Sequence, residues 1–202
     1  MPVGETCASI VTAFGLFREG LFREGLFREG PRERFKERKW MVPVVSVVGR
    51  SKSGKTTLVE KLIKELNSRG YKVGAIKHDA HQFDIDVPGK DSWRHTQAGA
   101  NPVVISSPDK LAMIKRVQQE ISLDEIVERY IDGVDIVLTE GYKRQDKLKI
   151  EVLTTGKEMI CSPSELIAVA GEDAVNIGDV PFFDRNDAKG ITLFLEKNFL
   201  KG

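Results

Sequence analysis

The segment that decides the fold is residues 42–78, "VPVVSVVGRSKSGKTTLVEKLIKELNSRGYKVGAIKH". Residues 44–48 form a β-branched run typical of a strand buried in a parallel sheet. Residues 49–56 then read G-x-x-x-x-G-K-[ST], and the leucines that follow recur on one face of an amphipathic helix. Gly70 ends that helix, and residues 71–76 predict a second strand. A phosphate-binding loop between a strand and a helix predicts a P-loop α/β domain.

The loop contains the residue types that phosphate binding requires. Gly49 and Gly54 allow backbone N–H groups to converge on phosphate oxygens beside the positive end of the helix. Lys55 supplies a charge to the β and γ phosphates, and the Thr56 hydroxyl is suited to Mg²⁺. Arg50 either reaches a phosphate or a second subunit's nucleotide, or is a solvated side chain. The predicted nucleotide-binding residues are Gly49, Arg50, Ser51, Lys52, Ser53, Gly54, Lys55, Thr56 and Thr57.

An acidic group for Mg²⁺ is expected at the end of a second buried strand. Residues 134–138 predict that strand, and Glu140 follows its carboxyl end, the edge where open parallel sheets bind ligands. Asp135 lies at the opposite end and is the weaker candidate. The predicted Mg²⁺ ligands are therefore Thr56 and Glu140. The helix before this strand opens with a capping box from Ser122 to Glu125, which supports α/β alternation.

The remaining segments complete the expected fold. Residues 148–155 and 166–170 are strand-like, and residues 187–199 predict a closing amphipathic helix. Residues 101–107 and 111–119 predict two further strands in an antiparallel arrangement. The predicted fold is a doubly wound α/β domain of the P-loop NTPase type, with a mostly parallel sheet and some antiparallel edge strands.

Composition limits the classes of partner. The chain has 202 residues, of which 41% are hydrophobic and 30% charged, and a net charge of +1. We expect no nucleic-acid partner, because that would need a basic excess. We expect no membrane partner, because no apolar run approaches the roughly 20 residues of a spanning helix. Cys7 and Cys161 form no CxxC pair, which favours a reducing cytoplasm.

The first forty residues differ from the rest. Residues 15–30 repeat the unit LFREG three times, and a period of five fits neither a helix nor a strand. We expect residues 1–40 to be a disordered appendage or an upstream translated stretch. The alternative is an arm that binds a partner or a membrane surface. The P-loop domain is then residues 41–202.

Residues 77–95, "KHDAHQFDIDVPGKDSWRH", contain every histidine of the chain. They follow the second strand, where P-loop proteins place a segment that senses the γ-phosphate. Pro88-Gly89 predicts that residues 83–92 form a mobile loop. A zinc site built on His78 and His81 is an alternative, although no cysteine joins them. General-base catalysis by either histidine, and ordinary surface histidines, are the other readings.

A resemblance to a known family narrows these alternatives. Residues 77–100, together with "GRSKSGKTTLVEKLI" (49–63) and "LTEGYK" (138–143), resemble the molybdopterin-guanine dinucleotide biosynthesis protein B family. The resemblance spans residues 44–152, with a weaker match at 180–191. It implies a homodimeric adaptor that binds GTP with Mg²⁺, hydrolyses it weakly and assists a separate guanylyltransferase, with molybdopterin as a possible ligand. The signature loop that it implies comprises Lys77, His78, His81, Asp86, Gly89, Lys90, Asp91, Ser92 and Arg94.

The resemblance leads to one hypothesis and leaves one question open. The hypothesis is that Lys90 and Arg94 attract the molybdopterin phosphate. The Asn-Lys-x-Asp box by which many GTPases read guanine is missing, so Asp173 or Asp184 is a candidate reader, and guanine preference depends on the resemblance alone. The alternative functions are a metal-insertion chaperone GTPase and a small P-loop kinase.

Overall fold

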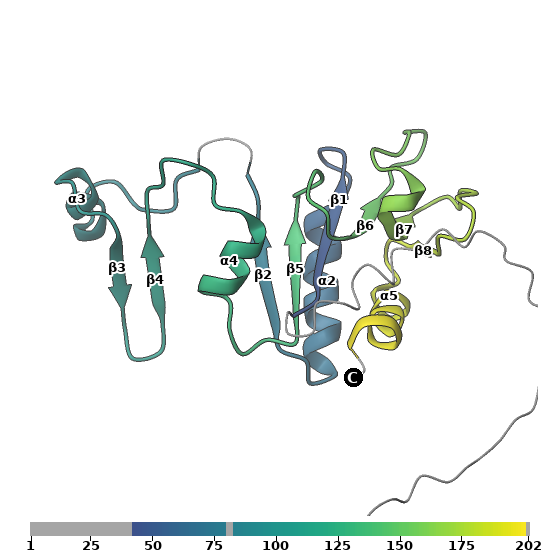
Figure 1. The fold of residues 1–202 in the computed structure, drawn as a ribbon, viewed down its shortest axis with the longest axis horizontal. Helices are drawn as coiled ribbons and strands as arrows, with labels where there is room; N and C mark the ends of the chain where they lie inside the picture. Colours follow the sequence, from purple (N-terminus) through teal and green to yellow (C-terminus); the bar gives the residue numbers. More distant parts are fainter. Residues whose placement is uncertain (1–41, 80–82, 201–202) are drawn as a thin grey trace, which may run out of the picture.

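The computed structural model describes residues 42–79 and 83–200. Six strands form one sheet in the order β2-β5-β1-β6-β7-β8, and every neighbouring pair is parallel (Figure 1). The strands are β1 (Val44–Gly49), β2 (Val73–Lys77), β5 (Ile136–Glu140), β6 (Leu148–Val152), β7 (Leu166–Gly171) and β8 (Phe182–Asp184). The predicted parallel α/β architecture is therefore confirmed.

The sheet is covered on both faces, which explains the continuous apolar runs of its strands. Val45 and Val47 of β1 face helices α2 (Lys55–Ser68) and α5 (Ala188–Leu195), which contact each other. Val44, one position out of phase, packs instead with helix α4 (Leu123–Tyr130) on the opposite face. Successive side chains of a strand point to opposite faces, so residues 44–48 of β1 are all buried.

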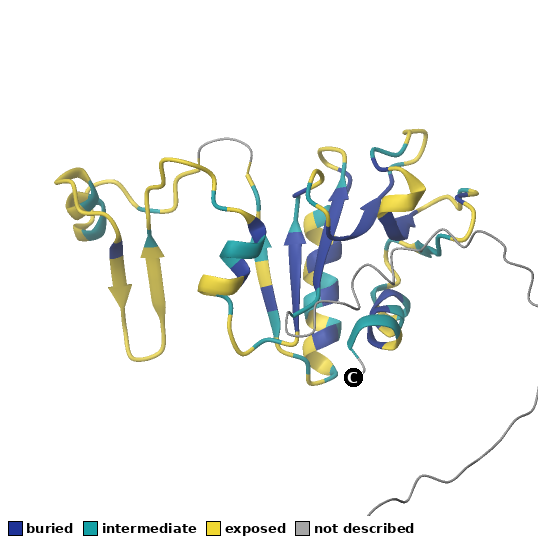
Figure 2. Cartoon of the chain, viewed as in Figure 1, coloured by how far each residue is buried: buried dark blue, intermediate teal, exposed yellow. Residues whose placement is uncertain are grey.

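The two antiparallel strands are separate from the main sheet. β3 (Val103–Ser106) and β4 (Leu111–Ile114) pair only with each other. With helix α3 (Asp91–Gln97) they form an arm, defined here as residues 83–117, which extends to one end of the molecule (Figure 1). Most of the arm is exposed (Figure 2). The strands were expected at a sheet edge, and they form an independent hairpin instead.

The structure corrects some local expectations. The expected loop at 83–92 ends earlier, because α3 starts at Asp91, an acid in the first turn of the helix. Strands expected at 71–76, 148–155 and 111–119 occupy Val73–Lys77, Leu148–Val152 and Leu111–Ile114. The closing helix divides into α5 and a π-helical turn, Glu196–Leu200.

Ser122 accepts the backbone N–H of Glu125 and so caps α4. Residues 1–40 lie outside the described residues.

Candidate functional site

The loop from Gly49 to Gly54 connects the centre of the sheet to α2. At Gly49, where φ is +149°, a Cβ atom would lie 2.6 Å from the Val152 carbonyl oxygen and 2.8 Å from Ser53 Oγ. Gly49 is therefore required both by the backbone conformation and by its close approach to β6. Gly54 precedes α2 with φ +94°. The first turn of the loop closes through a hydrogen bond from Ser53 N to the Arg50 carbonyl, 3.3 Å.

The cations of the loop have different surroundings. Lys55 Nζ donates to the Arg50 carbonyl oxygen at 2.6 Å, so its charge is directed back across the loop. Arg50 Nε donates to the Glu158 carbonyl oxygen at 3.2 Å, which ties this exposed side chain to the segment after β6. Lys52 has φ +62°. Ser51, Lys52, Thr56 and Thr57 are exposed, whereas Ser53 is buried and its Oγ has no hydrogen-bond partner in the described part of the chain.

Thr56 and Glu140 meet across the sheet edge. Thr56 Oγ1 donates to Glu140 Oε1 at 2.8 Å. Glu140 ends β5, the strand beside β1, so chain topology brings these residues together across 84 positions. The oxygen donors of a hydroxyl and a carboxylate are those that Mg²⁺ prefers. Asp135 lies at the other end of the strand, as the sequence predicts, and accepts the backbone N–H of Lys72 at 2.7 Å.

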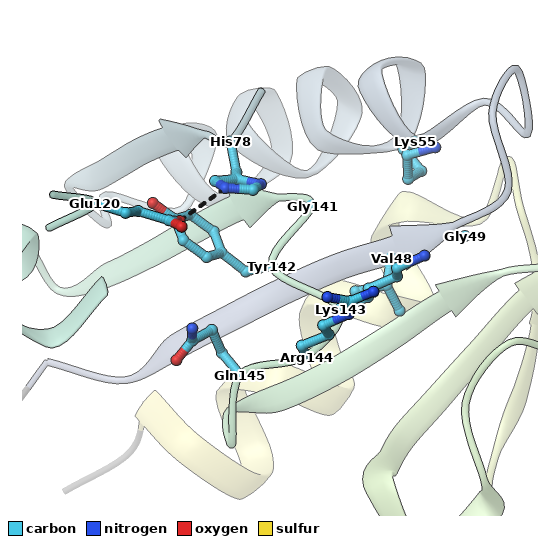
Figure 3. A pocket seen from close by; sticks show the side chains of 10 residues that line it. All are labelled: Val48, Gly49, Lys55, His78, Glu120, Gly141, Tyr142, Lys143, Arg144 and Gln145. Carbon is cyan, nitrogen blue, oxygen red and sulfur yellow. Dashed lines mark hydrogen bonds and ion pairs between the residues drawn. The ribbon is translucent and has the colours of Figure 1, made fainter. Parts of the chain in front are cut away.

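A cavity of about 440 Å³ adjoins the loop (Figure 3). Lys55 and Gly49 lie at one side, and the residues after β5 form much of the wall. The lining residues are Val48, Gly49, Lys55, His78, Glu120, Gly141, Tyr142, Lys143, Arg144 and Gln145. Of these, the sequence predicted Gly49, Lys55 and His78. Residues 141–145 directly follow Glu140, so their position in the sequence could have predicted that they lie near the site. Nothing in the sequence indicated that Glu120 lies there.

An aromatic pair lies at the other side of the cavity. The His78 and Tyr142 ring centroids are 4.5 Å apart, with the ring planes tilted by 39°. His78 Nε2 lies 2.9 Å from Glu120 Oε1 (Figure 3). Tyr142 is buried, and burial, together with the Glu120 charge, raises the pKa of its phenol. Glu120 follows the arm in sequence, so this contact connects the segment leaving the arm to the sheet edge.

The backbone joins His78 to the residues after β5. His78 N donates to the Glu140 carbonyl at 3.0 Å, and Gly141 N donates to the Val47 carbonyl at 3.1 Å. Gly141 has φ +102°, and a Cβ atom there would lie 3.2 Å from the His78 Cβ. A glycine at this position therefore allows the end of β2 to approach the turn that follows β5.

The signature loop divides between two places. Lys77 ends β2 beside Glu140, His78 follows it, and His81 lies outside the described residues. The others lie on the arm: Asp86, Gly89, Lys90, Asp91, Ser92 and Arg94. Asp86 Oδ1 accepts Ser92 Oγ at 2.8 Å and fixes the start of α3. The side chain of Arg94 is 71% exposed and lies 3.8 Å from Asp91. None of these arm residues lines the cavity.

The candidate guanine readers lie on the far strands of the same sheet edge. Asp173 Oδ2 accepts a hydrogen bond from Thr155 Oγ1 at 2.8 Å, shortly after β7. Asp184, the last residue of β8, accepts the backbone N–H of Asn186 at 2.7 Å. Neither residue lines the cavity. Both carboxylates therefore lie on the side of the loop away from His78.

Two properties of the described residues concern the alternatives of a metal site and a membrane partner. Within 42–79 and 83–200, no group of three or more His, Cys, Asp or Glu side chains is arranged to hold a metal ion. No helix in the same part of the chain is long and apolar enough to cross a membrane.

The parallel sheet, the glycine loop before α2 and the Thr56–Glu140 contact define a P-loop NTPase-type α/β protein. More specifically, the chain belongs to the molybdopterin guanine dinucleotide synthesis protein B (MobB) family, whose family model matches residues 44–172. The family predicted from the sequence is therefore confirmed.

Named relatives support this assignment. The chain is 35% identical over 164 residues to the molybdopterin-guanine dinucleotide biosynthesis adapter protein of Escherichia coli, covering 78% of this chain and 93% of that protein. It is 39% identical over 110 residues to the adapter protein of Haemophilus influenzae, covering 54% and 62%. A crystal structure of molybdopterin-guanine biosynthesis protein B has a TM-score of 0.60 at 34% identity, covering 76% and 97%. The structure of Bacillus subtilis MobB has a TM-score of 0.64 at 27% identity, covering 79% and 99%.

Proposed function

We propose that this protein is a cytoplasmic GTP-binding adaptor that assists a guanylyltransferase in molybdopterin-guanine dinucleotide biosynthesis. The observation that carries this proposal is the 2.8 Å contact between Thr56 and Glu140 beside the glycine loop, in a chain of the MobB family. The relatives are named as adapter proteins of this biosynthesis. Nucleotidyl transfer itself is assigned to the partner enzyme.

The site is suited to binding phosphates. Lys55 would exchange the Arg50 carbonyl for phosphate oxygens, replacing a neutral acceptor by a charged one, which forms the stronger hydrogen bond. Mg²⁺ would be held by Thr56 Oγ1, by Glu140 directly or through water, and by the phosphates, because this ion keeps several waters and few protein ligands. His78, which lines the cavity, is engaged with Glu120 through Nε2. We expect slow hydrolysis of GTP, as the family resemblance implies.

Equilibrium binding of GTP and ATP, each with Mg²⁺, to the full chain tests this proposal. Wild-type protein should prefer GTP. Lys55→Ala should weaken GTP binding by about 10–100-fold, since a hydrogen bond to a charged group contributes roughly 1.5–3 kcal/mol. Lys64→Ala is the matched control, because Lys64 is an exposed lysine of the same helix, outside the loop. An ATP preference, or equal loss in both variants, would contradict the proposal.

We propose a carboxylate as the reader of guanine, because it accepts the N1–H and N2–H groups together. Asp173→Asn and Asp184→Asn are a matched pair for this test, because each variant removes the negative charge of one of the two candidate readers. The variant that removes the reader should lose the preference for GTP over ATP and keep its total affinity for Mg-ATP. If both variants retain the preference, the reader is elsewhere in the chain.

We further propose that the protein is a homodimer through its arm. An isolated two-stranded hairpin is marginally stable in water, and the arm leaves many large apolar side chains exposed. These are Phe83, Ile85, Val87, Val104, Ile105, Leu111, Met113 and Val117. Leu111→Glu should shift the mass measured by analytical ultracentrifugation toward the monomer. Leu193→Glu, at an exposed leucine of α5, should leave it unchanged.

A further inference from the structure

We propose that the cavity beside Lys55 is a binding site for a second ligand, a planar nitrogen heterocycle that carries a phosphate group. This inference rests on the proposed function, because it places the ligand next to the phosphates of a nucleotide held by the loop. The volume of about 440 Å³ lies within the roughly 300–1,000 Å³ of small-molecule sites.

The position of the cavity identifies what the ligand faces. Lys55, the lysine of the phosphate-binding loop, lines it together with Gly49. The opposite side consists of His78, Glu120 and Tyr142 (Figure 3), none of which belongs to the loop. A molecule in this cavity would therefore touch the nucleotide phosphates at one end and residues of other elements at the other end.

Two cations make the cavity suitable for a second anion. Lys143 and Arg144 line it, and among the described residues neither forms an ion pair or a side-chain hydrogen bond. Other basic residues near carboxylates are paired, such as Lys147 with Asp124 and Lys149 with Glu165. Two phosphate-bearing ligands repel each other strongly at short range unless cations lie nearby. Arginine and lysine side chains form charge-assisted hydrogen bonds to phosphate.

The other side of the cavity is suited to a heterocycle. The tilted rings of His78 and Tyr142 offer an aromatic surface, and a planar ring system is stabilised by stacking on such a surface. The Glu120 side chain, bonded to His78 through Oε1, is 71% exposed. A carboxylate has about four acceptor sites, so Glu120 can accept ring N–H groups while it keeps its contact with His78.

We assign the phosphate of this ligand to a pair of cations other than the pair hypothesised from the sequence. The hypothesis from the sequence was Lys90 and Arg94, and both lie on the arm and outside the lining of the cavity. Lys143 and Arg144 are the basic pair that lines the cavity together with Lys55. The same chemistry is therefore assigned to a different pair of residues.

Neopterin monophosphate, a fluorescent pterin that bears a phosphate, is the probe for this site. It is titrated against the full chain with Mg²⁺ and a non-hydrolysable GTP analogue. The double variant Lys143→Ala/Arg144→Ala should weaken probe binding about tenfold or more, as expected for losing charge-assisted hydrogen bonds. Neopterin without the phosphate should bind more weakly than the probe, and equally to wild type and variant.

Matched variants make the result specific. Lys115→Ala/Arg116→Ala removes the same Lys-Arg sequence at an exposed position after β4, and should leave probe binding unchanged. Tyr142→Phe keeps the aromatic surface and should bind the probe like wild type, whereas Tyr142→Leu should bind it more weakly. Circular dichroism verifies the fold of each variant.

The outcomes separate this inference from the proposed function. Wild-type protein that binds the GTP analogue and not the probe would overturn the inference and leave the proposed function intact. Loss of probe binding in Lys90→Ala/Arg94→Ala, with normal binding in Lys143→Ala/Arg144→Ala, would also overturn it and return the phosphate to the arm. Failure of the wild type to bind the GTP analogue would refute the proposed function itself.

Discussion

Replacing Gly49 by alanine tests the geometry that holds the phosphate-binding loop against the sheet. The new Cβ atom would lie 2.6 Å from the Val152 carbonyl oxygen, a backbone atom that cannot rotate away, and the residue would keep φ +149°. A non-glycine residue in a sparsely populated backbone region costs about 1–3 kcal/mol. Forcing extra volume into a packed region costs about 1–3 kcal/mol more. We therefore expect Gly49→Ala to lower the free energy of unfolding by about 2–6 kcal/mol, a large part of the 5–15 kcal/mol typical of a domain.

Gly54→Ala is the matched control in the same loop. Gly54 has φ +94°, and a Cβ atom there would meet nothing within 4 Å, so only backbone strain of about 1–3 kcal/mol is expected. Urea unfolding of the full chain, followed by far-ultraviolet circular dichroism without nucleotide, measures both variants. If Gly49→Ala is no less stable than Gly54→Ala, the approach of the loop to β6 does not constrain the fold and the reasoning fails.

Three further predictions concern groups outside the loop. Hydrogen bonds from Lys149 and Ser162 lower the pKa of Glu165 from 4.5 to about 2, so its charge stabilises the folded state above pH 4.5 and this contribution is lost as the pH falls toward 2. Glu165→Gln should therefore be less stable than wild type at pH 7, and the difference in urea midpoint should shrink between pH 4.5 and pH 2; a constant difference would contradict the assignment. Burial raises the pKa of Cys161 to about 11, so iodoacetamide at pH 8 should label its peptide in urea and hardly label it in the native protein. Thr192→Val removes a fully buried hydroxyl that has no hydrogen-bond partner among the described residues, and should raise the free energy of unfolding by about 1 kcal/mol; a loss of stability would show that the hydroxyl is satisfied in solution.

The sequence predicted the structure of the arm only in part. The segment 83–92 has the acids, proline and glycine of a loop, and its second part instead starts α3, because Asp86 accepts the hydroxyl of Ser92 and orders the approach to the helix. The expected antiparallel strands do form, but as an independent hairpin. Local sequence patterns predict that the two strands form. They do not specify whether this pair of strands joins the sheet that the rest of the chain builds.

The sequence by itself determined the parallel α/β class, the phosphate-binding loop and the acid at the end of β5. These features depend on short-range requirements: glycines where the backbone must approach phosphate, β-branched residues in strands covered on both faces, and an acid directly after a buried run. Only the tertiary structure decided which distant groups share the cavity. His78 and Tyr142 stack, and Glu120 reaches His78 from 42 positions away, because the arm returns to the sheet edge where β2 and β5 end. It also decided that Lys143 and Arg144 line this cavity and that Lys90 and Arg94 do not, since the direction in which a chain returns depends on packing between elements and is not encoded in any one motif.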